Sequence, residues 1–151
     1  MMRQLTLLAL ALAAAPAFGQ GFSPQRGGQQ QGQGQLTIDT APAQVLIDRT
    51  CTFSTECYEA ESCTDTGFDI TLQGDAGGMD MQSMVLRTRL ISDAGTVEML
   101  GVQDSGAMSL SGGTFEARHL LTVNAEGAAR YSVHYIDGPM VVTYLGTCEG
   151  E

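Results

Sequence analysis

The sequence predicts one all-β domain, a small antiparallel meander barrel or sandwich, and three observations predict it. Apolar and polar residues alternate with a period of two after residue 64. Turn-forming residues interrupt this alternation at short intervals. The connections between the apolar runs are too short for crossover helices, which excludes a parallel α/β sheet. We therefore expect six to eight antiparallel strands in meander order.

The N-terminal part of the chain is typical of an export signal followed by a tether. Arg3 precedes an apolar run at residues 5–17, and small residues lead to a cleavage site that we place after Gly19. Residues 1–19 are therefore predicted to be a signal peptide. Residues 20–35 are rich in Gln and Gly and have almost no apolar surface to bury, which predicts a flexible linker.

Residues 36–151 are long enough for one folded domain with a modest core. The whole chain has a formal net charge of −10 and no lysine, and loss of the signal peptide removes one arginine and no acid. A chain this acidic repels nucleic acid and anionic membrane surfaces, whereas it suits a basic protein or a cation. We therefore expect no nucleic-acid partner. We also expect no membrane insertion, because no later stretch is apolar enough to span a bilayer.

Six stretches carry the alternation of a half-buried strand. In residues 84–91, Leu86 and Leu90 lie opposite Arg87 and Arg89. The other five stretches are residues 68–72, 96–100, 115–123, 129–136 and 140–147. In the stretch 115–123 the predicted inner face carries Phe115, Ala117, His119, Leu121 and Val123.

Six clusters of turn residues are predicted to separate these strands. The strongest hairpin signal is Asp137-Gly138, because both central residues of a type I′ turn need a positive φ. The clusters are residues 74–78, 92–95, 104–106, 111–113, 124–127 and 136–139.

Short strands joined by tight turns resemble the lipocalin-like and avidin-like barrels. The segment GAARYS at residues 127–132 and the closing strand also resemble the end of the periplasmic lysozyme-inhibitor β-barrels. The second resemblance covers about twenty residues and rests on Gly, Ala, Arg and Tyr.

The four cysteines are predicted to form two disulfides. Their spacing matches neither the C-x(2–4)-C pairs of zinc sites nor the C-x-x-C of thioredoxins, and an exported chain meets an oxidising compartment. Three pairings are open. We favour Cys57–Cys63, which closes an acidic loop, and Cys51–Cys148, which ties the first strand to the last. A disulfide leaves no thiol for catalysis.

Three methionines suggest a metal alternative. Met79, Met81 and Met84 form an M-x-M-x-x-M cluster, and thioethers select Cu(I). Met79 and Met81 would point the same way on a strand, but Met84 would not. The other interpretation is that these side chains fill gaps in the core.

The histidines and the acidic loop have simpler interpretations. His119 lies on an apolar face and is expected to be a partly buried residue with a hydrogen-bond partner. His134 is expected on an exposed face. The carboxylates of the Cys57–Cys63 region are expected to be solvated, because their spacing matches no EF-hand; they are Glu56, Glu59, Glu61 and Asp65.

The leading hypothesis is an exported domain, periplasmic or extracellular, that acts by binding a protein or a small ligand without catalysis. Tyr131, Tyr135, Tyr144 and His134 are the candidate binding residues, since Tyr offers contact area at low entropy cost. Their alternative role is packing. We expect a monomer, no cofactor and no enzymatic activity. The alternatives are a periplasmic copper-binding protein that uses the methionine cluster, a lysozyme-inhibitor-like protein, and a small hydrolase with paired carboxylates.

Overall fold

The computed structural model describes residues 37–138 and 140–150. The predicted signal peptide (1–19) and linker (20–35) lie outside the described residues. The described part begins with a short 3-10 helix, η1 (Ile38–Thr40), and continues as strands.

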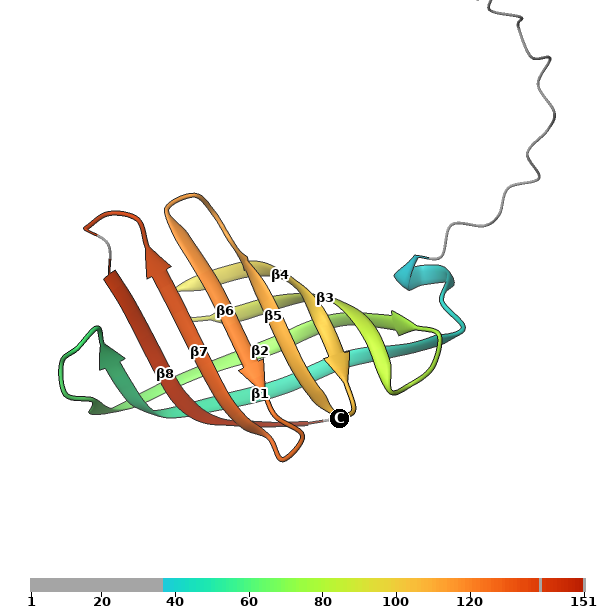
Figure 1. The fold of residues 1–151 in the computed structure, drawn as a ribbon, viewed down its shortest axis with the longest axis horizontal. Helices are drawn as coiled ribbons and strands as arrows, with labels where there is room; N and C mark the ends of the chain where they lie inside the picture. Colours follow the sequence, from blue (N-terminus) through green and yellow to red (C-terminus); the bar gives the residue numbers. More distant parts are fainter. Residues whose placement is uncertain (1–36, 139, 151) are drawn as a thin grey trace, which may run out of the picture. The chain divides into compact units, whose positions relative to one another are not determined.

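Eight antiparallel strands form a closed barrel in meander order, as Figure 1 shows. Each strand pairs with the next along the chain, and the last pairs with the first. This confirms the predicted all-β meander and selects the barrel over the sandwich. The strands are β1 (Ala43–Tyr58), β2 (Thr64–Gly78), β3 (Ser83–Ser92), β4 (Gly95–Asp104), β5 (Ala107–Gly113), β6 (Ala117–Val123), β7 (Ala128–Tyr135) and β8 (Met140–Glu149).

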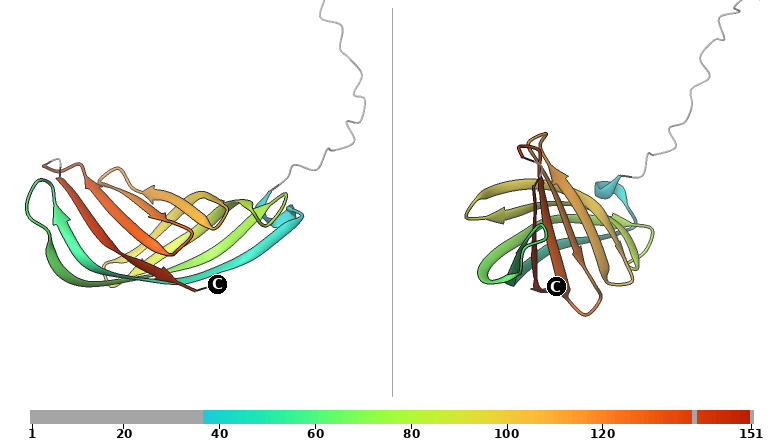
Figure 2. Two further views of the ribbon diagram at one scale, coloured as in Figure 1. Left: turned by 60° about the horizontal axis from the view of Figure 1, so that its bottom comes forward. Right: turned by 60° about the vertical axis from the view of Figure 1, so that its left-hand side comes forward.

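The barrel interior holds the hydrophobic core, because successive side chains of a strand point to opposite faces. Strand β3 shows this most clearly. Met84, Leu86 and Leu90 are buried inside, whereas Arg87 and Arg89 are exposed outside. β1 and β2 are the longest strands, and their hairpin runs along one side of the barrel (Figure 2). β8 pairs only with Thr50–Tyr58 of β1, so the barrel closes along the second half of that strand.

Two of the predicted turns are instead the ends of strands. Residues 74–78 belong to β2 and residues 111–113 to β5. Their glycines serve close strand contacts: a Cβ on Gly74 would overlap the carbonyl oxygen of Arg87, and one on Gly112 that of Glu98. The connections themselves lie one step further along the chain, so Phe115 is an exposed turn residue rather than an inward-facing one.

The type I′ geometry occurs at a different hairpin from the predicted one. Ser105 and Gly106 have φ values of 50° and 87° and join β4 to β5 as a two-residue loop. In the predicted turn only Gly138 has a positive φ, of 73°. The reason is length, because β7 and β8 resume pairing at Tyr135 and Met140 and leave four residues in the connection.

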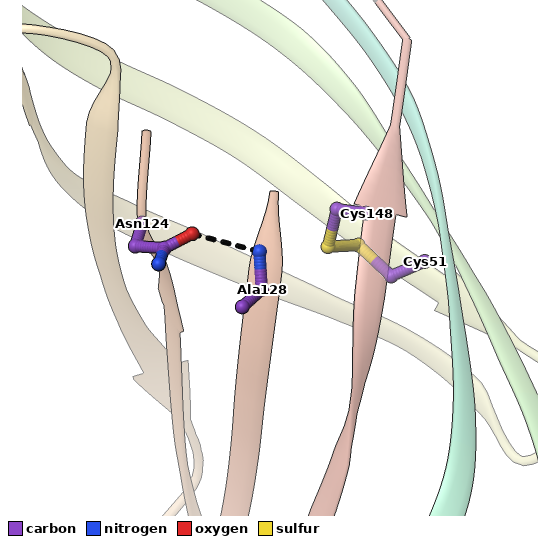
Figure 3. The surroundings of a disulfide bond; sticks show 4 residues. All are labelled: Cys51, Asn124, Ala128 and Cys148. Atoms are coloured by element: carbon purple, nitrogen blue, oxygen red, sulfur yellow. Dashed lines mark hydrogen bonds between the residues drawn. A yellow bond between two sulfur atoms is a disulfide. The ribbon is translucent and has the colours of Figure 1, made fainter. Parts of the chain in front are cut away.

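A disulfide between Cys51 and Cys148 joins the first strand to the last (Figure 3). The two cysteines are direct partners in the β1–β8 register. The backbone N–H of Cys148 also donates to the carbonyl oxygen of Gly127, at 2.8 Å. Asn124 steadies that turn, because its Oδ1 accepts the backbone N–H of Ala128 at 2.7 Å. The predicted pairing therefore holds, and it fixes the seam at which the barrel closes.

The second disulfide, Cys57–Cys63, closes the β1–β2 loop. Glu59 in this loop has a φ of 47° and anchors it to β8. Its backbone N–H donates to the Val141 carbonyl at 3.0 Å, and its Oε1 accepts the Val141 N–H at 2.6 Å. The disulfide thus closes the loop, and two hydrogen bonds hold it against β8. Two disulfides are compatible with an oxidising compartment.

Candidate ligand-binding site

All four tyrosines of the chain gather at one end of the barrel. Tyr58 ends β1, Tyr135 ends β7, and Tyr131 and Tyr144 are register partners on β7 and β8. Tyr58 pairs with Val142 and Tyr135 with Met140, so both lie beside the first residues of β8. We call this end of the barrel the mouth. It carries the loops 59–63, 93–94 and 114–116 and the turn residues 136–138, which lie on the left-hand side in Figure 1.

Aromatic rings form the floor of the mouth. The ring centroids of Phe68 and Tyr144 are 4.7 Å apart. The centroid of Tyr131 lies 6.0 Å from that of Phe68 and 5.8 Å from that of Tyr144. Phe53 lies 6.0 to 6.1 Å from all three. Rings at these distances stabilise one another beyond their burial. The floor is therefore a packed aromatic layer that separates the mouth from the aliphatic core.

His119 completes this layer from β6. Its ring stacks on Tyr131 with centroids 5.9 Å apart, and its Nδ1 is hydrogen-bonded to the Tyr131 hydroxyl at 2.6 Å. Burial lowers the pKa of His119, which favours the neutral ring. The prediction of a partly buried histidine with a hydrogen-bond partner is therefore correct.

A cavity of about 340 Å³ opens above the floor. A volume of this size is in the range of small-molecule sites. Among the described residues, its lining contains no charged side chain apart from the titratable His119. The lining residues are Phe68, Leu90, Ser92, Ala94, Gly95, Thr96, Val97, His119, Tyr131, Val133, Tyr135 and Tyr144.

Three larger hollows lie elsewhere and are less suited to a ligand. They measure about 600 Å³ over β5 to β8, about 530 Å³ over β3 to β6, and about 370 Å³ between η1 and the β2–β3 hairpin. Among the described residues, the only aromatic side chain that lines any of them is His119, in the second. Binding sites combine aromatic walls with a few polar groups. The mouth has this composition, and we take it as the candidate site.

A β-bulge turns one carboxylate towards the mouth. The β1–β8 register pairs Phe53 with Gly146 and Glu56 with Tyr144, with a shift between Phe53 and Thr55. Gly146 and Tyr144 are two residues apart and share the inner face, so their partners Phe53 and Glu56 share it too. Regular alternation would have placed Glu56 outside. Bulges commonly re-aim a side chain in this way near functional sites.

Burial and the Glu56 carboxylate raise the pKa of three tyrosines at the mouth. Burial raises the pKa of Tyr131 to about 12. Burial is also the main reason that the pKa of Tyr144 is raised, and the adjacent Glu56 carboxylate adds to it. The same carboxylate is the main cause of the raised pKa of Tyr58. Glu56 does not line the cavity itself but lies beside Tyr58 and Tyr144, of which Tyr144 lines the cavity.

The structure separates the residues that the sequence singled out for binding. Tyr131 is 3% exposed and belongs to the floor, Tyr144 is half-buried, and Tyr135 at the rim is 41% exposed. His134 pairs with Arg118, which is exposed on the outer face of β6, so His134 is exposed on the outer face of β7. It therefore lies on the other side of the sheet from His119. Sequence reasoning missed Tyr58, Phe68 and Glu56 as members of the site.

The methionine cluster is likewise divided. Met79 and Met81 are 70% and 56% exposed in the β2–β3 loop, whereas Met84 is 3% exposed inside the barrel. Met84 packs in the hydrophobic core with two other methionines, Met99 and Met108. The described arrangement therefore does not present three thioethers together at the surface.

Within residues 37–138 and 140–150, no group of three His, Cys, Asp or Glu side chains could hold a metal ion. No helix within the same ranges has the length and hydropathy needed to cross a membrane.

Comparison with known proteins found no protein family, no curated protein and no solved structure that matches this chain. The resemblances to lipocalin-like barrels and to lysozyme inhibitors therefore stay predictions. The geometry of the mouth carries the functional argument.

Proposed function

We propose that this protein is an exported, non-enzymatic binding domain that takes a small, largely apolar ligand in the mouth of its barrel. The observation that carries the proposal is the cavity of about 340 Å³ above the aromatic floor. An eight-stranded barrel is just wide enough to hold one small ligand. The buried hydrophobic core lies beyond the aromatic floor, so the ligand is expected in the mouth.

The chemistry of the lining indicates the kind of ligand. Rings and aliphatic side chains supply most of the contact surface, so the ligand is expected to be compact and mainly apolar. The polar side-chain groups of the lining are the His119 ring and five hydroxyls, those of Ser92, Thr96, Tyr131, Tyr135 and Tyr144, and they can hydrogen-bond a small number of polar groups. Export is supported by the N-terminal signal pattern and is compatible with the two disulfides.

Binding of neutral ring compounds tests the proposal. The exported chain would be titrated with indole, phenol and cyclohexanol while backbone amide resonances are recorded. At least one compound should bind saturably. Val97 lines the cavity from β4, so Val97→Phe should fill part of it and weaken binding about tenfold.

The matched control is Val102→Phe. Val102 lies on the same strand, but on the outer face, where it is 55% exposed. The same added volume there should leave the affinity unchanged. Dispersed amide spectra of both variants would show that each is folded. Absence of saturable binding by all three compounds, or equal loss in both variants, would refute the proposal.

A further inference from the structure

The loops around the mouth carry more carboxylates than the loops at the opposite end of the barrel. A neutral, apolar ligand would not require this excess of negative charge. Each of the four loops at this end carries at least one carboxylate, and none of their described residues is basic. The five loop carboxylates are Glu59, Glu61, Asp93, Glu116 and Asp137. The three loops at the opposite end carry only two, Asp80 and Glu126.

We propose that the mouth selects an organic cation, a compact alkylated ammonium group such as that of choline. The aromatic rings and the Glu56 carboxylate would bind this group jointly. The inference rests on the proposed function, since it names the ligand class of the same cavity. It also gives a role to Glu56, the one carboxylate that the bulge turns inward beside Tyr144.

The rings supply the first part of the recognition. The electron-rich faces of Phe and Tyr attract a cation within about 6 Å of the ring centroid, and the attraction grows when water is excluded. Phe68, Tyr131 and Tyr144 form the floor, and Tyr135 stands at the rim. An alkylated ammonium group also matches an apolar lining, because its charge lies under methyl groups and it demands no hydrogen bonds.

Glu56 supplies the second part, the countercharge. A carboxylate at the edge of a low-dielectric cavity attracts a cation more strongly than one in open water. No arginine lines the cavity among the described residues, and the two nearest in the register, Arg89 and Arg118, are exposed on the outer face. The chain has no lysine to compete. A bound cation would therefore meet one carboxylate and no fixed positive charge.

The loop carboxylates supply the third part, which acts at a distance. They are exposed, so salt screens them within about 8–10 Å at physiological ionic strength. A ring of one sign around a cleft raises the local concentration of ions of the other sign and repels anions. These loops therefore favour approach of a cation and exclude carboxylate or phosphate ligands.

A pair of isosteric probes tests the inference. Choline and 3,3-dimethylbutanol have the same shape, and differ in that a carbon replaces the charged nitrogen. Calorimetric titration should give an affinity for choline at least about tenfold higher, which corresponds to about 1.4 kcal/mol. The preference should shrink as the salt concentration rises.

Glu56→Gln should reduce the affinity for choline several-fold and leave that for the neutral isostere unchanged. Glu126→Gln is the matched control, because it removes one carboxylate from a turn at the opposite end. Equal affinity for the two probes, or the same effect of both variants, would overturn the inference. Failure of both isosteres while indole, phenol or cyclohexanol binds would also overturn it, yet leave the proposed function intact. Failure of all five compounds would overturn both.

Discussion

The Cys51–Cys148 disulfide should contribute far more to stability than Cys57–Cys63, and the two can be compared directly. The perturbations are the double variants Cys51→Ala/Cys148→Ala and Cys57→Ala/Cys63→Ala. A disulfide restricts the unfolded chain, and the restriction grows with the logarithm of the loop that it closes. The sequence separations are 97 and 6 residues.

These separations set the magnitudes. The chain-entropy relation gives about 4.7 kcal/mol for the long loop and about 2.3 kcal/mol for the short one. The difference, about 2.4 kcal/mol, should be a lower bound, because Cys51 and Cys148 are also buried in the core and their replacement removes packing. Small domains have only about 5–15 kcal/mol of stability, so the first variant should be marginal.

Urea unfolding of the wild type and both variants measures these costs as free energies of unfolding. Intact disulfides in the wild type would be verified by mass spectrometry without reduction. An equal or larger cost for the Cys57–Cys63 variant would refute the reasoning, as would a cost below about 2 kcal/mol for the Cys51–Cys148 variant. Either result would mean that closure of the barrel does not depend on this seam.

Three more outcomes follow from the packing and the pKa shifts. Gly146→Ala should lower the free energy of unfolding in urea by about 1–3 kcal/mol, because its Cβ would overlap the Thr52 carbonyl oxygen. Gly67 has open space around it, so Gly67→Ala should change that free energy by under about 0.5 kcal/mol. Acidification below pH 6.5 should lower stability, because burial lowers the pKa of His119 and the unfolded chain then binds a proton that the folded chain does not; His119→Gln should flatten this slope in thermal melts. Between pH 10 and about 12 stability should fall again, because Tyr131 ionises only in the unfolded chain. Phenolate absorbance should lose part of its late component in Tyr131→Phe, whereas the part that belongs to Tyr144, whose pKa burial also raises, should remain.

Each of these outcomes can also fail in a defined way. Equal effects of the two glycine substitutions would mean that β1 and β8 do not approach closely at Gly146. An unchanged acid slope in His119→Gln would assign that slope to other groups. Early ionisation of every tyrosine would contradict a buried aromatic floor.

The alternation of side chains made the fold predictable. In β3 the inward and outward residues follow the expected order from Met84 to Leu90, because one face meets the core and the other meets water. Glycine was the weak point. Gly74 and Gly112 suggested turns, yet both stand where neighbouring strands approach too closely for a side chain. A glycine needed for space and a glycine needed for a turn look alike in one sequence.

The mouth was only partly predictable for a related reason. Tyr131, Tyr135 and Tyr144 stood out because they lie on two adjacent predicted strands. Phe68 and Tyr58 join them only when β1 closes on β8, which depends on pairing over a long stretch of chain. Glu56 depends on the bulge, and no residue type marks that bulge in the sequence.

The most direct test of the account uses the tyrosines themselves. All four tyrosines lie at the mouth, so each isotopically labelled tyrosine ring reports on the mouth. The labelled protein would be titrated with the tightest-binding of indole, phenol and cyclohexanol. The account predicts that ring resonances of Tyr135 and Tyr144 shift together along one saturation curve. Unchanged tyrosine rings, with shifts confined to amides of the opposite loops at residues 105–106 and 124–127, would contradict it.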